Sequence, residues 1–302
     1  GIGKYMDDDI QRIIEGKQLE LGDRELPPFD EYRIYKNIQE AVMREEKRKN
    51  RRIRMPLFFK WTVACAIVLL VIGVGYNFYQ SHNEANLVYR EVCAVRGEKL
   101  LVLLPDGSRV WLNADSKLTY PEQFAKYNRN VTLEGEAYFE IAENKKSPFQ
   151  VLAENVKIQV TGTCFNVKAY ASDKVIKTTL DEGSINIGHV QSRRPMQQML
   201  PGQTAVYEKR SNVIKIKTDR YHDDASSWKS NRLIFRNASL KEVLTTLSRH
   251  FDIEITVKNE KIASFTYDFV CKGNDLNYVL EVMQSITPVS FKKISEYTYT
   301  VE

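Results

Sequence analysis

The sequence predicts a membrane-anchored protein in four parts: a helical cytoplasmic segment, one transmembrane helix, an all-β domain and a small α+β C-terminal domain. Three observations predict this fold class. An uncharged hydrophobic run lies early in the chain, a long stretch with strand periodicity follows it, and strand and helix patterns alternate after about residue 228. The length of 302 residues leaves room for two folded domains, and 43% hydrophobic with 27% charged residues is a globular composition.

Residues 1–54 are polar and carry two apolar patterns with helical spacing. Asp30 follows two prolines and is placed to cap the second helix. The apolar positions of the two patterns are Ile10, Ile13 and Ile14, and then Ile34, Tyr35, Ile38, Ala41 and Val42. Two stripes of this size bury too little surface for a core of their own. We therefore expect a partner to stabilise this segment, and the alternative is a solvated tail.

The run from Trp61 to Tyr79, WTVACAIVLLVIGVGYNFY, contains no charge over 19 residues. At about 1.5 Å per residue it matches the roughly 30 Å hydrocarbon core of a bilayer, which predicts a transmembrane helix within residues 55–80. Aromatic residues at both ends match the belts found at membrane interfaces. The alternative is a cleaved signal peptide, but its basic region belongs at the very N-terminus, and here 60 residues precede the run.

Positive charge is concentrated on the N-terminal side of this run. Eight Lys or Arg residues lie between positions 44 and 60, whereas Arg90 stands alone between position 80 and Arg96. The positive-inside rule predicts a cytoplasmic N-terminus, with everything after about residue 80 outside. A nucleic-acid patch is the alternative interpretation of the cluster, but the adjacent span explains it. The net charge of +5, from 44 basic and 39 acidic residues, predicts no direct nucleic-acid partner.

Residues from about 88 to 217 show period-two patterns broken by turns, which predicts strands. The stretch LLVLLPDGSRVWLN places Pro105, Asp106 and Gly107 between two apolar runs, which is a hairpin signal. No long helical pattern interrupts the strands that follow. We expect an all-β domain over residues 81–220, built either as a sandwich or as a short coil of β-turns.

After about residue 228 the patterns follow the order β-α-β-β-α-β-β, which predicts a small α+β domain within residues 221–302. Ser239 and Asp275 are placed as N-caps of its two helices. The apolar stripes of both helices are expected to pack on a sheet. Residues 222–230 are interpreted as the linker that joins this domain to the β domain.

The cysteines and histidines show no spacing typical of a disulfide framework or a metal site. Cys65 lies in the hydrophobic run, and three scattered cysteines follow it. Four histidines are dispersed, and YHDD at 221–224 is interpreted as a polar linker and not as a ligand set. No constellation of acid, base and nucleophile is visible. We therefore expect no metal, no cofactor and no enzymatic activity.

Five motifs in order carry a resemblance to a known family: LPDGSRVWLNADSKLTYP, RNVTLEGEAYFEIA, SPFQV, VTGTCFNVKAY and TLDEGSINI. They resemble the periplasmic domain of the FecR family of membrane-spanning sigma-factor regulators, over most of residues 95–207. The C-terminal residues resemble the small domain found in Bacteroidetes members. That domain is similar to the short N-terminal domain of secretins and TonB-dependent transducers.

The resemblance implies a single-pass protein of the inner membrane that relays a signal from the periplasm. An outer-membrane TonB-dependent transducer would contact the periplasmic domains, and residues 1–54 would bind an extracytoplasmic-function sigma factor. For that contact we expect Ile34, Tyr35, Ile38 and Val42. Family members usually carry a longer helical anti-sigma segment, so either the N-terminus is trimmed or the sigma-binding unit is reduced. The alternative function is a periplasmic binding or assembly module for a transducer or secretin, without sigma regulation.

The stretch VTGTCFNV, residues 160–167, carries a candidate reactive site. Cys164 has no histidine nearby in sequence, so we do not expect a papain-type nucleophile. Gly162 is expected to allow a positive φ between two strands. In a second interpretation the Thr163 hydroxyl attacks the Gly162 carbonyl, and water cleaves the resulting ester. Some regulators of the FecR type are self-cleaved at a Gly-Thr pair that resembles this one.

Overall fold

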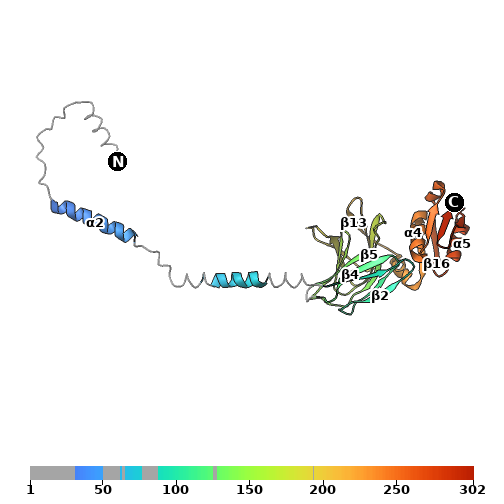
Figure 1. Ribbon diagram of the computed structural model, residues 1–302, viewed down its shortest axis with the longest axis horizontal. Helices are drawn as coiled ribbons and strands as arrows, with labels where there is room; N and C mark the ends of the chain where they lie inside the picture. Colours follow the sequence, from blue (N-terminus) through green and yellow to red (C-terminus); the bar gives the residue numbers. More distant parts are fainter. Residues whose placement is uncertain (1–30, 50–61, 63–64, 77–87, 125–127, 193) are drawn as a thin grey trace, which may run out of the picture. The chain divides into compact units, whose positions relative to one another are not determined.

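The computed structural model describes residues 31–49, 62, 65–76, 88–124, 128–192 and 194–302 (Figure 1). The chain divides into two compact units, Gly1–Tyr79 and Gln80–Glu302. The cap expected at Asp30 and the apolar pattern around Ile13 lie outside the described residues.

The described part of the first unit is helical. Helix α2 spans Glu31–Lys49 and confirms the helix expected from the apolar spacing. Residues 65–76, in the middle of the expected span, are also helical, and every side chain there is exposed. Within the described ranges, no helix combines the length and the hydrophobicity that crossing a bilayer requires. The transmembrane helix therefore stays a prediction.

The β domain confirms the expected strands. Its strands are β1 (Tyr89–Ala94), β2 (Leu100–Leu103), β3 (Arg109–Leu112), β4 (Ser116–Pro121), β5 (Arg129–Glu140), β6 (Phe149–Ala153), β7 (Val156–Val160), β8 (Cys164–Ala169), β9 (Val175–Glu182), β10 (Ile185–His189), β11 (Gln197–Met199), β12 (Gln203–Glu208) and β13 (Val213–Thr218). The hairpin expected around Asp106 joins β2 to β3, which pair antiparallel.

Strand β5 connects two layers of sheet. Its first half pairs with β4 and, in parallel, with β6, whereas its second half pairs with β3 and β8. One layer has the order β1-β4-β5-β6-β7-β10-β11, and the other has the order β2-β3-β5-β8-β9-β12-β13. Gly135 lies where β5 crosses between layers, with φ +99°, and a Cβ there would lie 2.3 Å from the Ser116 Oγ. Only glycine fits this crossing without displacing its neighbour.

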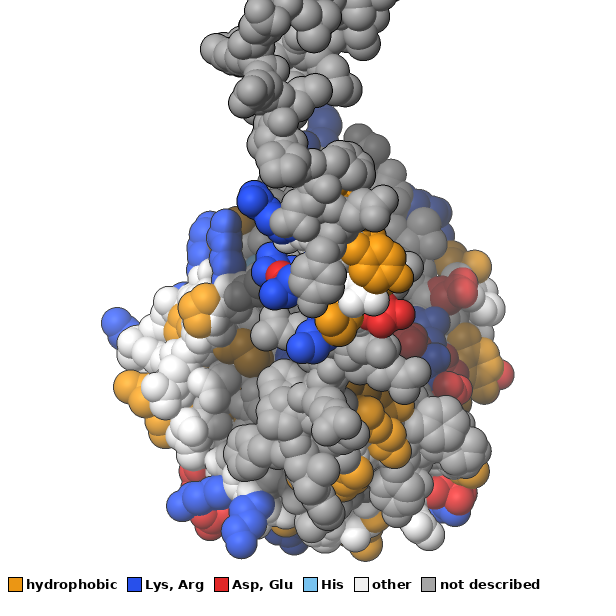
Figure 2. Space-filling view, turned by 90° about the vertical axis from the view of Figure 1, so that its left-hand side faces the viewer, with side chains coloured by type: hydrophobic (Ala, Val, Ile, Leu, Met, Phe, Trp, Pro, Cys, Tyr) orange, Lys and Arg blue, Asp and Glu red, His pale blue; other side chains and the backbone are white. Residues whose placement is uncertain are grey.

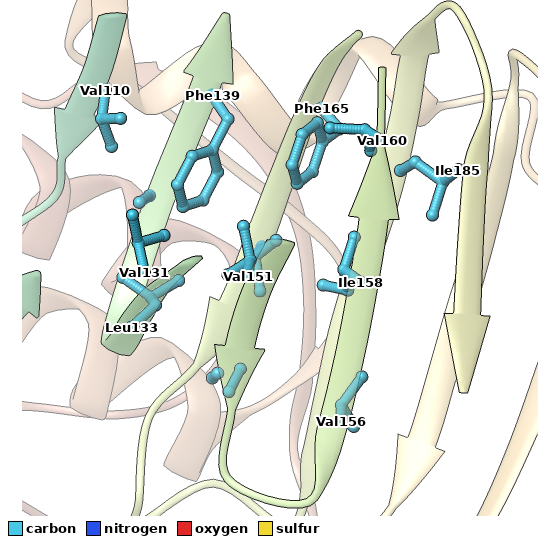
Figure 3. Close-up of a cluster of buried hydrophobic side chains, with 14 of the residues drawn as sticks. Val110, Val131, Leu133, Phe139, Val151, Val156, Ile158, Val160, Phe165 and Ile185 are labelled. Atoms are coloured by element: carbon cyan, nitrogen blue, oxygen red, sulfur yellow. The ribbon is translucent and has the colours of Figure 1, made fainter. Parts of the chain in front are cut away.

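The core lies between the two layers. Figure 3 shows Phe139 of β5 and Phe165 of β8 beside one another, with Ile158 and Ile185 of the other layer directed into the same interior. The two phenyl rings stack with centroids 5.0 Å apart. Burying a large apolar side chain contributes about 1.5–3 kcal/mol. Because two layers of strands enclose one core between them, the all-β domain is a sandwich, the first of the two expected forms.

The C-terminal elements follow the expected order, with two short 3-10 helices added. They are η1 (His222–Ser230), β14 (Arg232–Ser239), α4 (Leu240–Phe251), β15 (Glu254–Val257), η2 (Glu260–Ser264), β16 (Thr266–Lys272), α5 (Leu276–Ile286), β17 (Phe291–Lys293) and β18 (Thr298–Val301). Strands β14 and β16 pair antiparallel, and β15-β18-β17 form a second small sheet in which β15 and β18 are parallel.

Both helix caps are confirmed. The Ser239 hydroxyl accepts a hydrogen bond from the Glu242 backbone N–H, and the Glu242 side chain closes the capping box. The Asp275 carboxylate caps α5. The stripes of both helices are buried in the domain core, with Val243, Leu247 and Val279 fully enclosed.

Residues 222–230 lie between β13 and β14, where the linker was expected, and they are folded. They form η1, which ends at Asn231 in the left-handed conformation and buries Trp228 to 7% exposure. The indole supplies enough apolar surface to hold the connection against the β domain. The polar residues around it, Asp223 and Asp224 among them, had suggested a solvated segment.

Candidate functional site

The four side chains expected to contact a partner are exposed on α2. Ile34, Tyr35, Ile38 and Val42 are 46, 68, 57 and 54% exposed. Their spacing places them on one side of the helix. An exposed apolar stripe on a polar helix is typical of a helix that docks on a partner.

The junction between the β domain and the α+β domain is a network of buried hydrogen bonds. The Trp228 Nε1 donates to Asn166 Oδ1 at 3.1 Å, and Asn166 Nδ2 donates to Glu136 Oε1 at 3.0 Å. Asn113 Nδ2 donates to the other oxygen of the Glu136 carboxylate at 2.9 Å. The Lys99 ammonium donates to the Trp228 carbonyl oxygen at 2.8 Å, and burial lowers the pKa of Lys99. Asn166 and Glu136 alternate along β8 and β5 with the core residues Phe165 and Ala137, so the network ties η1 to the outer face of this layer.

Lys229 is held between aromatic rings next to this network. Its ammonium lies 3.5 Å from the ring centroid of Tyr138 and 4.4 Å from that of Trp111. The same ammonium lies 3.6 Å from Glu140 Oε1. Cation–π contact and ion pairing therefore act on one side chain of η1 from the surface of the β domain.

Arg249, in the last turn of α4, is the second anchor of the junction. It is 7% exposed, and its Nη2 donates to Ser172 Oγ at 2.7 Å and to Asp173 Oδ1 at 2.9 Å. The guanidinium carbon lies 3.5 Å from the Tyr170 ring centroid. The Arg249 carbonyl oxygen accepts from the Gly97 backbone N–H at 2.8 Å. These contacts join the α+β domain to loops of the β domain, so residues 80–302 form one compact unit.

The Gly162-Thr163 pair lies in a tightly packed turn before β8. Gly162 does not have a positive φ, so that expectation was wrong. Close approach favours glycine here instead, because a Cβ at Gly162 would lie 3.0 Å from the Glu143 Cα, a tight contact. The Thr163 hydroxyl is buried and donates to the Ser184 carbonyl oxygen at 3.0 Å. A Cβ at Gly183 would lie 2.6 Å from the Gly162 carbonyl oxygen.

Cys164 follows the pair and is half-buried. Burial raises the pKa of its thiol, and the carboxylates of Glu182 and Glu140 raise it further. A thiol with a raised pKa is a weak nucleophile at neutral pH, because the thiolate is the reacting form. The environment of Cys164 is thus unlike that of a catalytic cysteine.

The two domains of the second unit define a family. Residues 91–186 match the family described as FecR protein, and residues 232–301 match the one described as FecR, C-terminal. Together the matches span more than half of the chain, and the chain belongs to the FecR family. This is a family of regulatory proteins and not of enzymes, as expected. No curated protein matches the chain.

Solved structures with the same architecture exist. Two crystal structures of a candidate anti-sigma factor from Parabacteroides distasonis are 26% identical to this chain, each with a TM-score of 0.65. The similarity covers 71% and 70% of this chain and 98% of each crystallised chain. The length of chain covered by the similarity is therefore comparable to the length of the whole second unit.

Replacing Arg249 with Leu is expected to destabilise the second unit by about 3 kcal/mol, because the change leaves the carboxylate of Asp173 without its buried partner. Chemical denaturation of the purified full chain measures the effect. Arg236→Leu is the matched control, since Arg236 pairs with Asp224 at an exposed position and its loss should cost less than about 1 kcal/mol. Equal effects of the two variants would contradict the anchoring role of Arg249.

Self-cleavage between Gly162 and Thr163 requires the Thr163 hydroxyl. If the bond is cleaved, the wild-type chain yields a fragment ending at Gly162, Thr163→Ala stays at full length, and Thr163→Ser retains cleavage. Intact mass spectrometry of protein purified from cells distinguishes the three. A wild-type chain that stays at full length, with no fragment ending at Gly162, would contradict self-cleavage and leave the pair a purely structural role.

Proposed function

We propose that the chain is an anti-sigma factor that relays a signal from an outer-membrane TonB-dependent transducer across the inner membrane to an extracytoplasmic-function sigma factor. The observation that carries the proposal is the exposed apolar stripe of α2 ahead of a FecR fold. The similarity to a candidate anti-sigma factor supports it.

In this proposal the chain crosses the inner membrane once, with its N-terminus in the cytoplasm and its C-terminus in the periplasm. The helical residues 65–76 carry apolar side chains on every side, and all of them are exposed. A helix that is apolar all round is stable only in an apolar surrounding, which a bilayer provides. The basic residues between positions 44 and 60 orient it.

The transducer would bind the α+β domain. Strands β15 and β17 are the edge strands of a three-stranded sheet, and among the described residues each pairs with the central strand β18. An open strand edge accepts a strand from a partner through backbone hydrogen bonds. The anchored junction would then carry a contact on this domain to the sandwich, because the two domains form one compact unit.

On the face drawn in Figure 2, the visible charged side chains of the described residues are of both signs. Figure 2 shows basic and acidic side chains interspersed with hydrophobic and neutral ones among the coloured atoms. Neither charge dominates among the coloured atoms of this face. Regulation of transcription would therefore act through the sigma factor and not through DNA contacts of this face.

The open strand edges also suit an alternative function. A periplasmic binding or assembly module would use the same strand addition to a transducer or secretin, with no sigma factor involved. The two functions differ in the role of the α2 stripe, which the alternative leaves without a partner.

Ile38→Glu is expected to abolish sigma-factor binding, because it places a charge in the middle of the α2 stripe. The wild-type chain and the variant, each with an N-terminal tag, are purified from native membranes, and the co-purifying sigma factor is quantified by mass spectrometry. The matched control is Lys36→Gln, which changes the net charge by the same amount outside the stripe.

The proposal predicts a sigma factor with the wild type and the control, and at least a tenfold loss with Ile38→Glu. A wild-type eluate that contains envelope proteins and no sigma factor would contradict the proposal and favour the assembly module. Retention of the sigma factor by Ile38→Glu would show that the α2 stripe is not the contact.

A further inference from the structure

Three potential metal ligands meet where η1 packs against β9. Asp181 lies on β9, and His222 and Asp223 open η1. One ligand atom from each lies within 4.8 Å of the other two, the one such group of three among the described residues. Two of these residues belong to the YHDD stretch that had been interpreted as a polar linker. The third, Asp181, lies well before them in the sequence, so no local spacing pattern predicts the cluster.

The imidazole of His222 is oriented for a metal. Its Nδ1 lies 3.2 Å from the carbonyl oxygen of Asp219, and a carbonyl oxygen only accepts hydrogen bonds. The Nδ1 therefore carries the hydrogen, and in the neutral ring the Nε2 keeps its lone pair. A backbone carbonyl on one ring nitrogen is the usual partner of a histidine that binds metal through the other. The Nε2 lies 3.3 Å from Asp223 Oδ1, a common spacing between two ligands of one ion.

The carboxylate of Asp181 has one oxygen without a hydrogen-bond partner. Its Oδ2 accepts from the Tyr138 hydroxyl at 2.9 Å, whereas its Oδ1 is shielded from solvent and unpaired. An unpaired buried carboxylate oxygen is costly, and a cation removes that cost. The Tyr138 hydroxyl would hold the carboxylate in a fixed orientation, as hydrogen-bond donors behind metal ligands commonly do.

We propose that Asp181, His222 and Asp223 bind a divalent cation of the zinc class. One imidazole nitrogen with two carboxylates is a zinc ligand set, and water completes the coordination on the exposed side of Asp223. Calcium is disfavoured because it takes six to eight oxygen ligands. The bound ion ties η1 to β9 and so adds a further connection at the domain junction. This site is independent of sigma-factor binding.

The nearby lysine is already bound to other groups and does not neutralise the two carboxylates of the site. Lys229 lies in the last turn of η1. That ammonium is already paired with Glu140 and held over the Tyr138 ring. The competing arrangement is a protonated His222 paired with Asp223, without metal. The two arrangements differ in whether added zinc is bound.

The test uses the full chain, purified in detergent and freed of metal with a chelator. Equilibrium dialysis against Zn²⁺ at neutral pH measures the bound equivalents. The wild type is expected to bind one equivalent more than His222→Ala, and Asp181→Asn is expected to bind that equivalent at least tenfold more weakly. Asp224→Asn is the control, because Asp224 lies in η1 beside the ligands but pairs with Arg236 and should bind as the wild type does.

Thermal unfolding of the same proteins guards against a variant that fails to fold. Zn²⁺ is expected to raise the unfolding midpoint of the wild type and of Asp224→Asn, but not that of His222→Ala. The metal-free midpoints show whether each variant is folded. Equal zinc binding by wild type and His222→Ala would overturn the proposal and support the protonated pair. Stabilisation by Ca²⁺ with none by Zn²⁺ would also overturn it.

Discussion

The second unit depends on the buried carboxylate of Glu136. Removing an unpaired carboxylate from water costs several kcal/mol, so a folded chain keeps one only where donors surround it. Here two asparagine amides donate to its oxygens, and one of them, Asn166, accepts from the indole of Trp228. The Glu136 carboxylate thus holds the Asn166 side chain in place, and Asn166 in turn holds Trp228 of η1. Because η1 carries the chain from the sandwich to the α+β domain, these hydrogen bonds help to set how the two domains join.

Features that depend on local chemistry could be predicted from the sequence, and features that depend on long-range packing could not. Three kinds of feature follow from residues within one helix or one pair of strands. They are the caps at Ser239 and Asp275, the apolar stripes of α4 and α5, and the β2–β3 hairpin. The choice of a sandwich depends on β5 changing partners at Gly135, which no periodicity reveals. The cluster around His222 and the pairing of Arg249 with Asp173 join residues far apart in sequence.

The candidate reactive turn shows how one residue type serves two purposes. Glycine was expected at position 162 for its backbone freedom, but the structure favours it there because the chain passes close to Glu143. The sequence cannot distinguish these reasons, since both favour a residue without a Cβ. For the α2 stripe, both the helix and the exposure of its apolar side chains agree with the prediction from the sequence. The identity of its partner depends on a second protein, which the sequence of this chain does not describe.

The central claim is that a membrane separates α2 from the FecR domains. Cells converted to spheroplasts are treated with a membrane-impermeant maleimide, and the full chain is then isolated. Cys93 is exposed on β1, whereas burial raises the pKa of Cys164 and Cys271 and slows their reaction. In a Cys93→Ser background, Gln39→Cys places a probe on α2. We predict labelling of Cys93 in intact spheroplasts and labelling of Gln39→Cys only after lysis. Labelling of both before lysis, or of neither, would contradict the account.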